Sequence, residues 1–462
     1  MKRSTILCVL LALLICFGLI PIGMPVAAAG SGAYEGQGGT FTWRDNGDGT
    51  ASIISFVGGG DVLVPDKVYD ESGAVLRVIR LGSGNEGFQR IGVFMNNERI
   101  TSVTVPEGIE EFYGYTFYGC RNMTALRVPS TLKLVDNPSY AFQYTGLTDL
   151  SGFKDAVQLD RLFVDNAKLT NIYGISNLTN LTTLSLKGNQ IQELDALKNL
   201  TNLTQVYLTN NAIQDISGLA SLPNLHTVGL EGNAIANIAP LADKQNLDTL
   251  FLGGNSRVAD ASVLMDLPNL RWVELQGTAV PNSQAMELTE FSDGTATAAD
   301  IGKTVSITPK RKVETSGGYV HAAATYTYSD PTVAEMKPNG IDLSFIPKAA
   351  GTTTVTATFG GISKTFTITV MDYQLGDIDG SGKEYPDNAI NANDALLALR
   401  HSVKEINLAD DAAMAKLDIP AGALKRANVT AAKDPKEPLT QVDASDALQI
   451  LRYSVKEINS FY

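Results

Sequence analysis

A period of 22 residues runs through the middle of the chain, from Leu159 to about Pro281. The segment LTTLSLKGNQI begins at Leu181, LTQVYLTNNAI at Leu203, LHTVGLEGNAI at Leu225 and LDTLFLGGN at Leu247. A unit this short cannot bury its own apolar side chains, so neighbouring repeats must stack and share one continuous core. The sequence therefore predicts a solenoid of stacked coils.

Each repeat contains a short predicted strand in which the apolar residues at positions 4 and 6 point inward. An asparagine at position 9 falls at a sharp turn, where its amide can satisfy unpaired backbone groups. The first coil has its asparagine one residue early, at Asn166, and the last has Thr278, as expected for coils that cap the stack. The asparagines in register are Asn189, Asn211, Asn233 and Asn255.

This pattern resembles the leucine-rich repeat of the bacterial internalin type, which implies an α/β solenoid over residues 156–282. Upstream, residues 34–155 repeat more loosely. ITSVTVPEGIE from Ile100 is echoed by MTALRVPSTLK from Met123, and YTFYGC from Tyr115 by YAFQYT from Tyr140. This region resembles the surface-antigen type of leucine-rich repeat found in anaerobic bacteria. NGDGTASII from Asn46 resembles the entry hairpin that often precedes such repeats.

Positions 3, 5 and 7 of each strand are predicted to point outward onto the concave face of the solenoid. Large rings at these positions are expected to anchor a protein or glycan partner. An alternative stays open, in which the rings pack on one another or on a neighbouring module. The rings are Phe163, Tyr207, Phe251 and Trp272. The other outward residues are Arg161, Asp165, Thr183, Ser185, Lys187, Gln205, Thr209, Thr227, Gly229, Glu231, Thr249, Gly253, Glu274 and Gln276.

Two segments follow the repeats. Residues 283–300 are small and polar, which predicts a linker. Residues 301–372 alternate polar and apolar positions, as in TYTYSDPTVAEM, GTTTVTATFGG and KTFTITV, which predicts a small all-β antiparallel sandwich. Its SDPTVA and AAGTTTVTA phrases resemble the bacterial immunoglobulin-like domain, which implies a spacer.

The C-terminal residues 374–462 contain one helix twice, each copy after a loop rich in oxygen ligands. ANDALLALRHSVKEIN begins at Ala392, ASDALQILRYSVKEIN begins at Ala444, and GDIDGSG from Gly376 precedes the first copy. A duplicated loop and helix of this kind resembles a dockerin of type I, a small all-α module that binds Ca²⁺ and attaches a secreted protein to a cohesin on a scaffold.

A calcium loop places oxygens at defined positions and a glycine at the turn. The first loop fits with an insertion around Lys383, and an acidic turn capping a helix is the alternative. The second loop is degraded, because Ala432 occupies a ligand position. Whether the second loop binds Ca²⁺ therefore stays open. The candidate ligands are Asp377, Asp379, Ser381, Asn391 and Asp394, then Asn428, Thr430, Asp443 and Asp446.

Both C-terminal helices are amphipathic, with apolar residues at helical spacing. An ordinary solvated face is the alternative for the opposite stripe. The resemblance to dockerins implies that this stripe contacts cohesin. The residues concerned are Ala392, Asn393, Leu399, Arg400 and Lys404, matched by Ala444, Ser445, Leu451, Arg452 and Lys456.

Residues 1–29 have a basic start at Lys2 and Arg3, an apolar run and the small residues Ala27–Ala29, which predicts a secretory signal peptide. Of three cysteines only Cys120 follows it, which excludes an internal disulfide and favours a small buried side chain. The formal net charge of −13 argues against nucleic-acid partners and anionic membranes. No later apolar stretch is long enough to span a bilayer.

The three histidines, His226, His321 and His401, fall in different modules, and no phosphate loop or zinc spacing occurs. The sequence therefore predicts a non-catalytic, secreted, multidomain binding protein attached to a cohesin-bearing scaffold, as in a cellulosome. One alternative is a free surface adhesin whose C-terminal module is a calcium-stabilised cap. Another is a polysaccharide-active enzyme in the N-terminal region.

Overall fold

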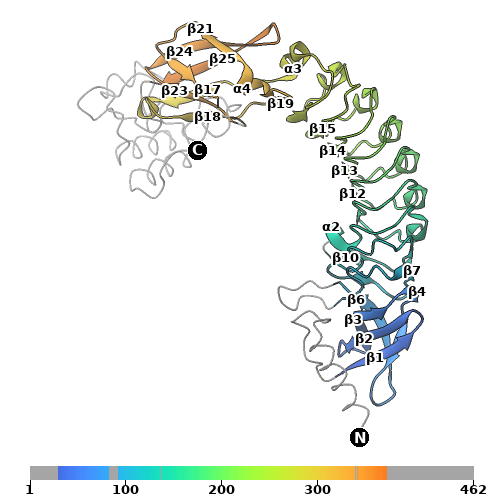
Figure 1. Cartoon of the computed structure of the whole chain (residues 1–462). Coiled ribbons are helices and arrows are strands. Elements are labelled where there is room, and N and C mark those ends of the chain that lie inside the picture. The colour runs from blue at the N-terminus through green and yellow to red at the C-terminus, as the bar shows by residue number, and fades with distance from the viewer. Residues whose placement is uncertain (1–29, 83–91, 137, 339, 341, 372–462) are drawn as a thin grey trace, which may run out of the picture. The chain divides into compact units, whose positions relative to one another are not determined.

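The computed structural model describes residues 30–82, 92–136, 138–338, 340 and 342–371 (Figure 1). The chain divides into two compact units. Unit 1 comprises Met1–Ala259 and Asp266–Leu270, and unit 2 comprises Asp260–Met265 and Arg271–Tyr462. Unit 1 therefore contains the looser repeats of residues 34–155 and most of the 22-residue repeats of residues 156–282.

Unit 1 begins with a mixed β-sheet. Its antiparallel part consists of β1 (Ser31–Gly36), β2 (Gly39–Asp45) and β3 (Thr50–Gly58). The parallel part continues from β3 through β6 (Val75–Leu81), β8 (Glu111–Phe112) and β10 (Leu134–Val135), while β5 (Lys67–Tyr69) pairs antiparallel with β6. The turn predicted at Asn46 connects β2 to β3, and its backbone N–H donates to the carbonyl of Thr50 at 3.0 Å.

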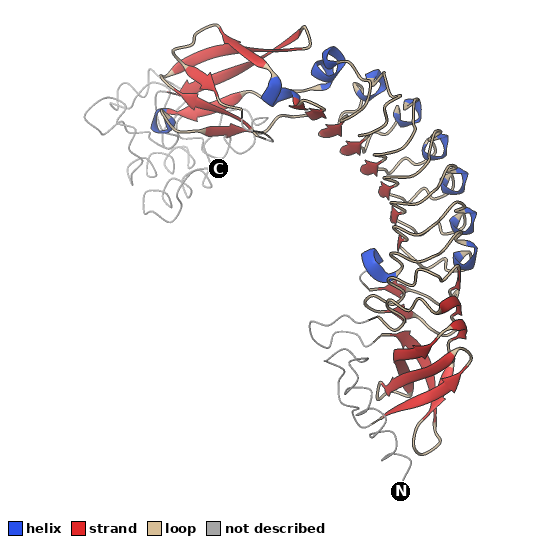
Figure 2. Cartoon of the chain, viewed as in Figure 1, coloured by secondary structure: helices blue, strands red, loops and turns tan. Residues whose placement is uncertain are grey.

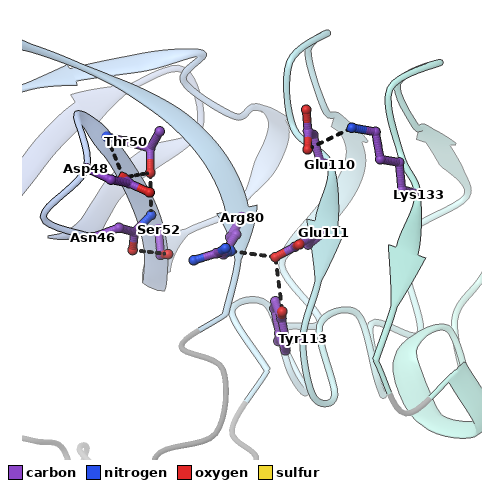
Figure 3. A network of polar contacts seen from close by, with 9 residues as sticks. All are labelled: Asn46, Asp48, Thr50, Ser52, Arg80, Glu110, Glu111, Tyr113 and Lys133. Atoms are coloured by element: carbon purple, nitrogen blue, oxygen red, sulfur yellow. Dashed lines mark hydrogen bonds and ion pairs between the residues drawn. The ribbon is translucent and has the colours of Figure 1, made fainter.

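Polar side chains tie this sheet together (Figure 3). Arg80 on β6 forms an ion pair with Glu111 on β8 at 2.5 Å, and the Tyr113 hydroxyl donates to the same carboxylate at 3.0 Å. The hydrogen bond to Glu111 raises the pKa of Arg80. In the hairpin turn, the Thr50 hydroxyl donates to Asp48 at 2.5 Å, and this bond lowers the pKa of that carboxyl. The Arg80–Glu111 ion pair therefore links β6 to β8, and the Thr50–Asp48 hydrogen bond lies within the hairpin turn.

The first coils are built around stacked phenylalanines. Phe117 lies between Phe94 and Phe142, with ring centroids 5.2 and 5.7 Å away and nearly parallel planes. Cys120 is fully buried beside them and its thiol donates to the Phe94 carbonyl at 3.0 Å. Burial raises the pKa of the Cys120 thiol to about 12. The prediction of a small buried side chain is confirmed. The backbone of these coils forms β4 (Gly60–Leu63), β7 (Ile100–Thr104), β9 (Ala125–Arg127) and α2 (Pro138–Ala141).

The 22-residue coils of unit 1 each contain a three-residue strand and a 3₁₀ helix. The strands pair in parallel without register shifts and lie along one side of the unit, with the 3₁₀ helices on the opposite side (Figure 2). The strands are β11 (Arg161–Phe163), β12 (Thr183–Ser185), β13 (Gln205–Tyr207), β14 (Thr227–Gly229) and β15 (Thr249–Phe251). The helices are η1 (Ser151–Phe153), η2 (Tyr173–Ile175), η3 (Asp195–Leu197), η4 (Ser217–Leu219) and η5 (Ala239–Leu241).

The asparagines at position 9 satisfy backbone groups at the turn, as predicted, and they also connect neighbouring coils. The Asn211 amide donates to the carbonyls of Leu186 and Leu208, both at 2.9 Å, and its oxygen accepts from the Ile191 N–H at 3.0 Å. The same set of bonds recurs at Asn189, Asn233 and Asn255. Each asparagine therefore satisfies backbone groups that the turn leaves unpaired in two adjacent coils.

Unit 2 contains the strand β16 (Trp272–Glu274) and two β-sheets. The four-stranded sheet has the order β17 (Gly294–Thr297), β25 (Ile362–Met371), β24 (Gly351–Phe359) and β21 (Thr325–Tyr328). The three-stranded sheet has the order β18 (Val305–Ile307), β23 (Leu343–Pro347) and β22 (Ala334–Met336). The pairs are antiparallel as expected, except that β17 and β25 are parallel. The short elements are η6 (Ser262–Leu264), η7 (Ala298–Asp300), β20 (Gly318–Tyr319) and α4 (Val320–Ala323).

The expected linker at 283–300 is wrong for most of its length. The helix α3 (Asn282–Leu288) buries Ala285, Met286 and Leu288 completely, and β17 follows it. A few apolar residues at helical spacing are enough to dock this segment, although its composition is mostly small and polar.

Candidate functional site

The strand face of the unit 1 coils is the surface that the sequence predicts to bind a partner. We define it as positions 3, 5 and 7 of the coils from Leu159 to Gly253. Positions 4 and 6 of these coils are fully buried, as predicted, from Leu162 and Val164 to Leu250 and Leu252. Because side chains alternate along a strand, positions 3, 5 and 7 of these coils lie on the opposite side, as predicted.

Large and small residues alternate at position 5 along the strand face. Phe163, Tyr207 and Phe251 are half-buried rings, and the coils between them carry Ser185 and Gly229. The alternation corrects the sequence prediction at these two small positions, because Ser185 is only 1% exposed and Gly229 is also buried. Neighbouring strands lie about 4.8 Å apart, so the rings recur about every 10 Å along the face.

The Tyr207 ring is held by residues of the two adjacent coils. The Lys187 ammonium lies 4.4 Å from the ring centroid, a cation–π contact. On the other side, a Cβ added at Gly229 would lie 3.2 Å from Cδ1 of the ring, so only glycine leaves it full room. Partial burial raises the pKa of the Tyr207 hydroxyl. The ring therefore packs on neighbours, as the open alternative held, and still remains half-exposed.

Asp165 departs further from the prediction. It was expected on the open face, yet it is only 9% exposed. Its carboxylate accepts from the Ser185 hydroxyl at 2.7 Å and from the Lys187 N–H at 2.8 Å. Burial raises the pKa of Asp165, and the two hydrogen bonds oppose this effect. Asp165 therefore holds the adjacent coil in place and is not an open contact residue.

Further along the face, the Thr209 hydroxyl donates to the Glu231 carboxylate at 2.8 Å. Lys187 and Glu231 thus place both signs of charge near Tyr207. The face combines half-exposed rings with charges that neighbours orient, an arrangement found at protein interfaces.

The fourth predicted ring, Trp272, belongs to unit 2. It is half-buried on β16, which pairs in parallel with β19 (Lys312–Thr315). The sequence did not predict this pairing, because β19 comes from the region expected to form a separate domain. Gln276 donates to Glu314 on β19 at 3.3 Å, and its N–H donates to Glu274 at 2.7 Å.

The predicted metal and cohesin sites lie outside the described residues. This holds for the candidate Ca²⁺ ligands from Asp377 to Asp446 and for the cohesin-contacting residues from Ala392 to Lys456. The predicted signal peptide, 1–29, lies outside them as well. Within the described part of the chain, no group of His, Cys, Asp and Glu side chains could hold a metal ion. Among the same residues, no helix is both long and apolar enough to cross a membrane.

One comparison with known protein families supports the repeat assignment. A family model of leucine-rich repeats in two copies matches residues 179–221 and 201–243. Among solved structures, an internalin C2 of Listeria monocytogenes is 23% identical over 38% of this chain and 80% of its own, with a TM-score of 0.29. An internalin (inlF) of the same organism is 21% identical over 51% of this chain and 76% of its own, also with a TM-score of 0.29. No curated protein sequence matches the chain. The stacked coils at the centre of this chain are therefore leucine-rich repeats.

Proposed function

We propose that the chain is a non-catalytic, secreted binding protein whose strand face binds a protein partner. The alternation at position 5 is the observation that supports this most strongly. Ser185 and Gly229 lie between the three rings at the same position of the repeat. Phe163, Tyr207 and Phe251 therefore do not pack directly against one another, and each stays partly exposed. Leucine-rich repeats with such a face offer a broad surface for another protein.

Tyr207 is the centre of the proposed contact. The cation–π contact with Lys187 restricts its ring before a partner arrives, so little side-chain entropy is lost on binding. Tyrosine also joins a large apolar surface to a polar hydroxyl, a combination enriched among residues that dominate binding energy. The charges of Lys187 and Glu231 would then select a partner with complementary charges.

The remaining modules are assigned from sequence resemblance. Residues 374–462 would form a dockerin that binds a cohesin with Ca²⁺, and residues 301–372 an immunoglobulin-like spacer. Residues 1–29 would direct secretion. The duplicated C-terminal segments support the dockerin, and the two sheets of unit 2 are compatible with a sandwich-type spacer. Together they would display the leucine-rich repeats on an extracellular scaffold.

Capture experiments with the full-length chain test the proposal. Wild type, the Tyr207→Ala/Phe251→Ala variant and a control variant, Tyr69→Ala/Tyr173→Ala, would be immobilised side by side. The control removes two tyrosines that are exposed elsewhere on unit 1. We expect proteins captured by wild type and by the control to be absent with the strand-face variant. Identical capture by all three would refute the strand-face assignment.

A further inference from the structure

Four tyrosines form a continuous row at the surface of the first coils of unit 1. In spatial order they are Tyr140, Tyr115, Tyr118 and Tyr144, with centroid distances of 5.0, 5.4 and 5.6 Å between successive rings. Arg121 ends the row, with its guanidinium carbon 5.7 Å from the Tyr144 centroid. Tyr140 is 41% exposed and the other three are half-buried. We call these four residues the tyrosine row.

Tyr144 occupies a backbone position at which the neighbouring coils have asparagine or glycine. Its N–H donates to the carbonyl of Asp165, as the N–H of Asn166 does to Lys187 and that of Gly188 to Thr209. This bond repeats along the coils and identifies one column of residues in the left-handed region. The other members in unit 1 are Asn96, Gly119, Asn166, Gly188, Asn210, Gly232 and, by its place in the repeat, Gly254, with φ between 54° and 75°. Tyr144, with φ of 59°, is the one member that is neither asparagine nor glycine.

A tyrosine in this conformation is strained, whereas glycine tolerates it and asparagine adopts it more readily. Such strain persists where something else selects the side chain, often a function. Core packing does not supply the reason, because the buried aromatic stack is formed by Phe94, Phe117 and Phe142. The Tyr144 ring contacts Tyr118 and Arg121, which both lie at the surface.

The hydroxyl groups of the row distinguish it from tyrosines with a structural role. Tyr113, Tyr326 and Tyr328 each use the hydroxyl in a hydrogen bond within the protein. None of the four row hydroxyls is hydrogen-bonded to another residue of the described chain. The row therefore presents partly exposed rings together with hydroxyls that make no hydrogen bond within the described chain.

We propose that the tyrosine row binds a single chain of an uncharged polysaccharide. A sugar residue has C–H groups on its faces and hydroxyls at its edges, which match ring faces and phenol hydroxyls respectively. The ring spacing of 5.0–5.6 Å is close to the length of one sugar residue in an extended chain. The ring planes are inclined by 46–88°, so the surface is corrugated and suits one chain better than a flat crystalline face.

Two other ligand classes fit less well. A polyproline II segment repeats on one face about every 9 Å, well beyond the spacing of these rings. Anionic polymers would meet a chain with a net charge of −13, and Glu98 lies 3.8 Å from Arg121, the cation of the row. The inference is independent of the proposed function, because it concerns other coils and another ligand chemistry.

Affinity electrophoresis of the full-length protein tests the inference, with a soluble mixed-linkage β-glucan, a xylan and a galactomannan as separate probes. Tyr144→Asn places the residue of neighbouring coils at this position and should relieve the strain. We expect at least one neutral polysaccharide to retard wild type, and Tyr144→Asn combined with Tyr118→Ser to weaken binding at least fivefold. Tyr144→Asn alone should leave the melting temperature unchanged or higher.

Two controls separate this site from the strand face. Tyr69→Asn, at a tyrosine that is 51% exposed outside the row, and Tyr207→Ala should both bind the polysaccharide like wild type. Failure of all three polysaccharides to retard wild type would overturn the inference, as would undiminished binding by the Tyr144→Asn/Tyr118→Ser variant. Neither result would affect the protein-binding proposal, which the Tyr207 variants test.

Discussion

The ammonium nitrogen of Lys187 lies 4.4 Å from the centroid of the Tyr207 ring in the adjacent coil. The contact joins two positions of the strand face, so the orientation of its central ring depends on the residue next to it. It also shows how a 22-residue period creates a surface. Residues far apart in the chain become neighbours because each coil is stacked in register on the next.

Lys187→Met tests this contact, because it keeps most of the side-chain length and removes the charge. We expect a loss of about 0.5–1 kcal/mol in unfolding free energy, the range for exposed cation–π pairs. Urea unfolding combined with Tyr207→Ala in a double-mutant cycle gives the coupling energy. Lys198→Met, at an exposed lysine paired with Asp195, is the control. A coupling of zero between Lys187 and Tyr207 would contradict the interpretation.

Asn211→Ala tests the asparagine ladder. The change leaves the carbonyls of Leu186 and Leu208 and the Ile191 N–H without these partners inside the solenoid. We expect a loss of about 2–4 kcal/mol, because unsatisfied buried groups are costly. The control is Asn202→Ala, since Asn202 makes one exposed hydrogen bond to Thr179. Equal losses in urea unfolding for the two variants would show that the ladder contributes little.

Lys244 occupies a column that is otherwise apolar, with Ala156 in the first coil and leucine in the others. It is 2% exposed, and its ammonium group donates to the Ala220 carbonyl at 2.5 Å. The equivalent residues Leu178, Leu200, Leu222 and Leu267 are fully buried. Lys244→Leu should therefore stabilise unit 1 by about 1–3 kcal/mol at neutral pH, because it removes the burial of a charged group. Thermal unfolding would measure the gain, and a destabilised variant would contradict the conclusion that burying the Lys244 charge is costly.

The pH dependence of the same variant has a definite sign. Burial lowers the pKa of Lys244 below its ordinary value of 10.5, and Asp243 partly opposes this. The unfolded state therefore binds more protons between the folded pKa and 10.5, so wild-type stability rises with pH across that window. The advantage of Lys244→Leu should shrink over the same window. An advantage that stays constant would show that Lys244 carries no such cost.

The regular part of this fold follows from the sequence because its causes are periodic. Leu184 and Leu186 recur in phase, and their burial and the bonds of Asn189 were predicted. Burial of Asp165 and Ser185 was not, because it depends on side-chain packing between adjacent coils. For the same reason the sequence did not anticipate the alternation of rings and small residues.

Other features of the fold were not predicted from the sequence, because no local pattern indicates them. Tyr144 has a left-handed backbone only because its coil is in register with Asn166 and Gly188. The pairing of β19 with β16 joins segments that were assigned to different domains. A search for residues that break a glycine and asparagine column would have found Tyr144 once the coils were aligned.

The proposed calcium loops lead to a further prediction for residues 374–462. Asp377→Ala with Asp379→Ala should reduce Ca²⁺ affinity more than Asn428→Ala with Thr430→Ala, because the first pair removes two negative ligands. Isothermal titration with Ca²⁺ measures both variants, and titration with a panel of cohesins, with and without chelator, tests the partner. Equal losses would contradict the ligand assignment, and cohesin binding unaffected by chelator would remove Ca²⁺ from the mechanism.

The strand-face proposal is tested most directly by measuring partner capture and thermal unfolding on the same Tyr207→Ala/Phe251→Ala protein. We predict that capture is lost while the melting temperature stays nearly unchanged, because both rings are half-exposed and the leucine core beneath them is intact. A marked fall in melting temperature with capture intact would contradict the account, since the rings would then serve packing alone.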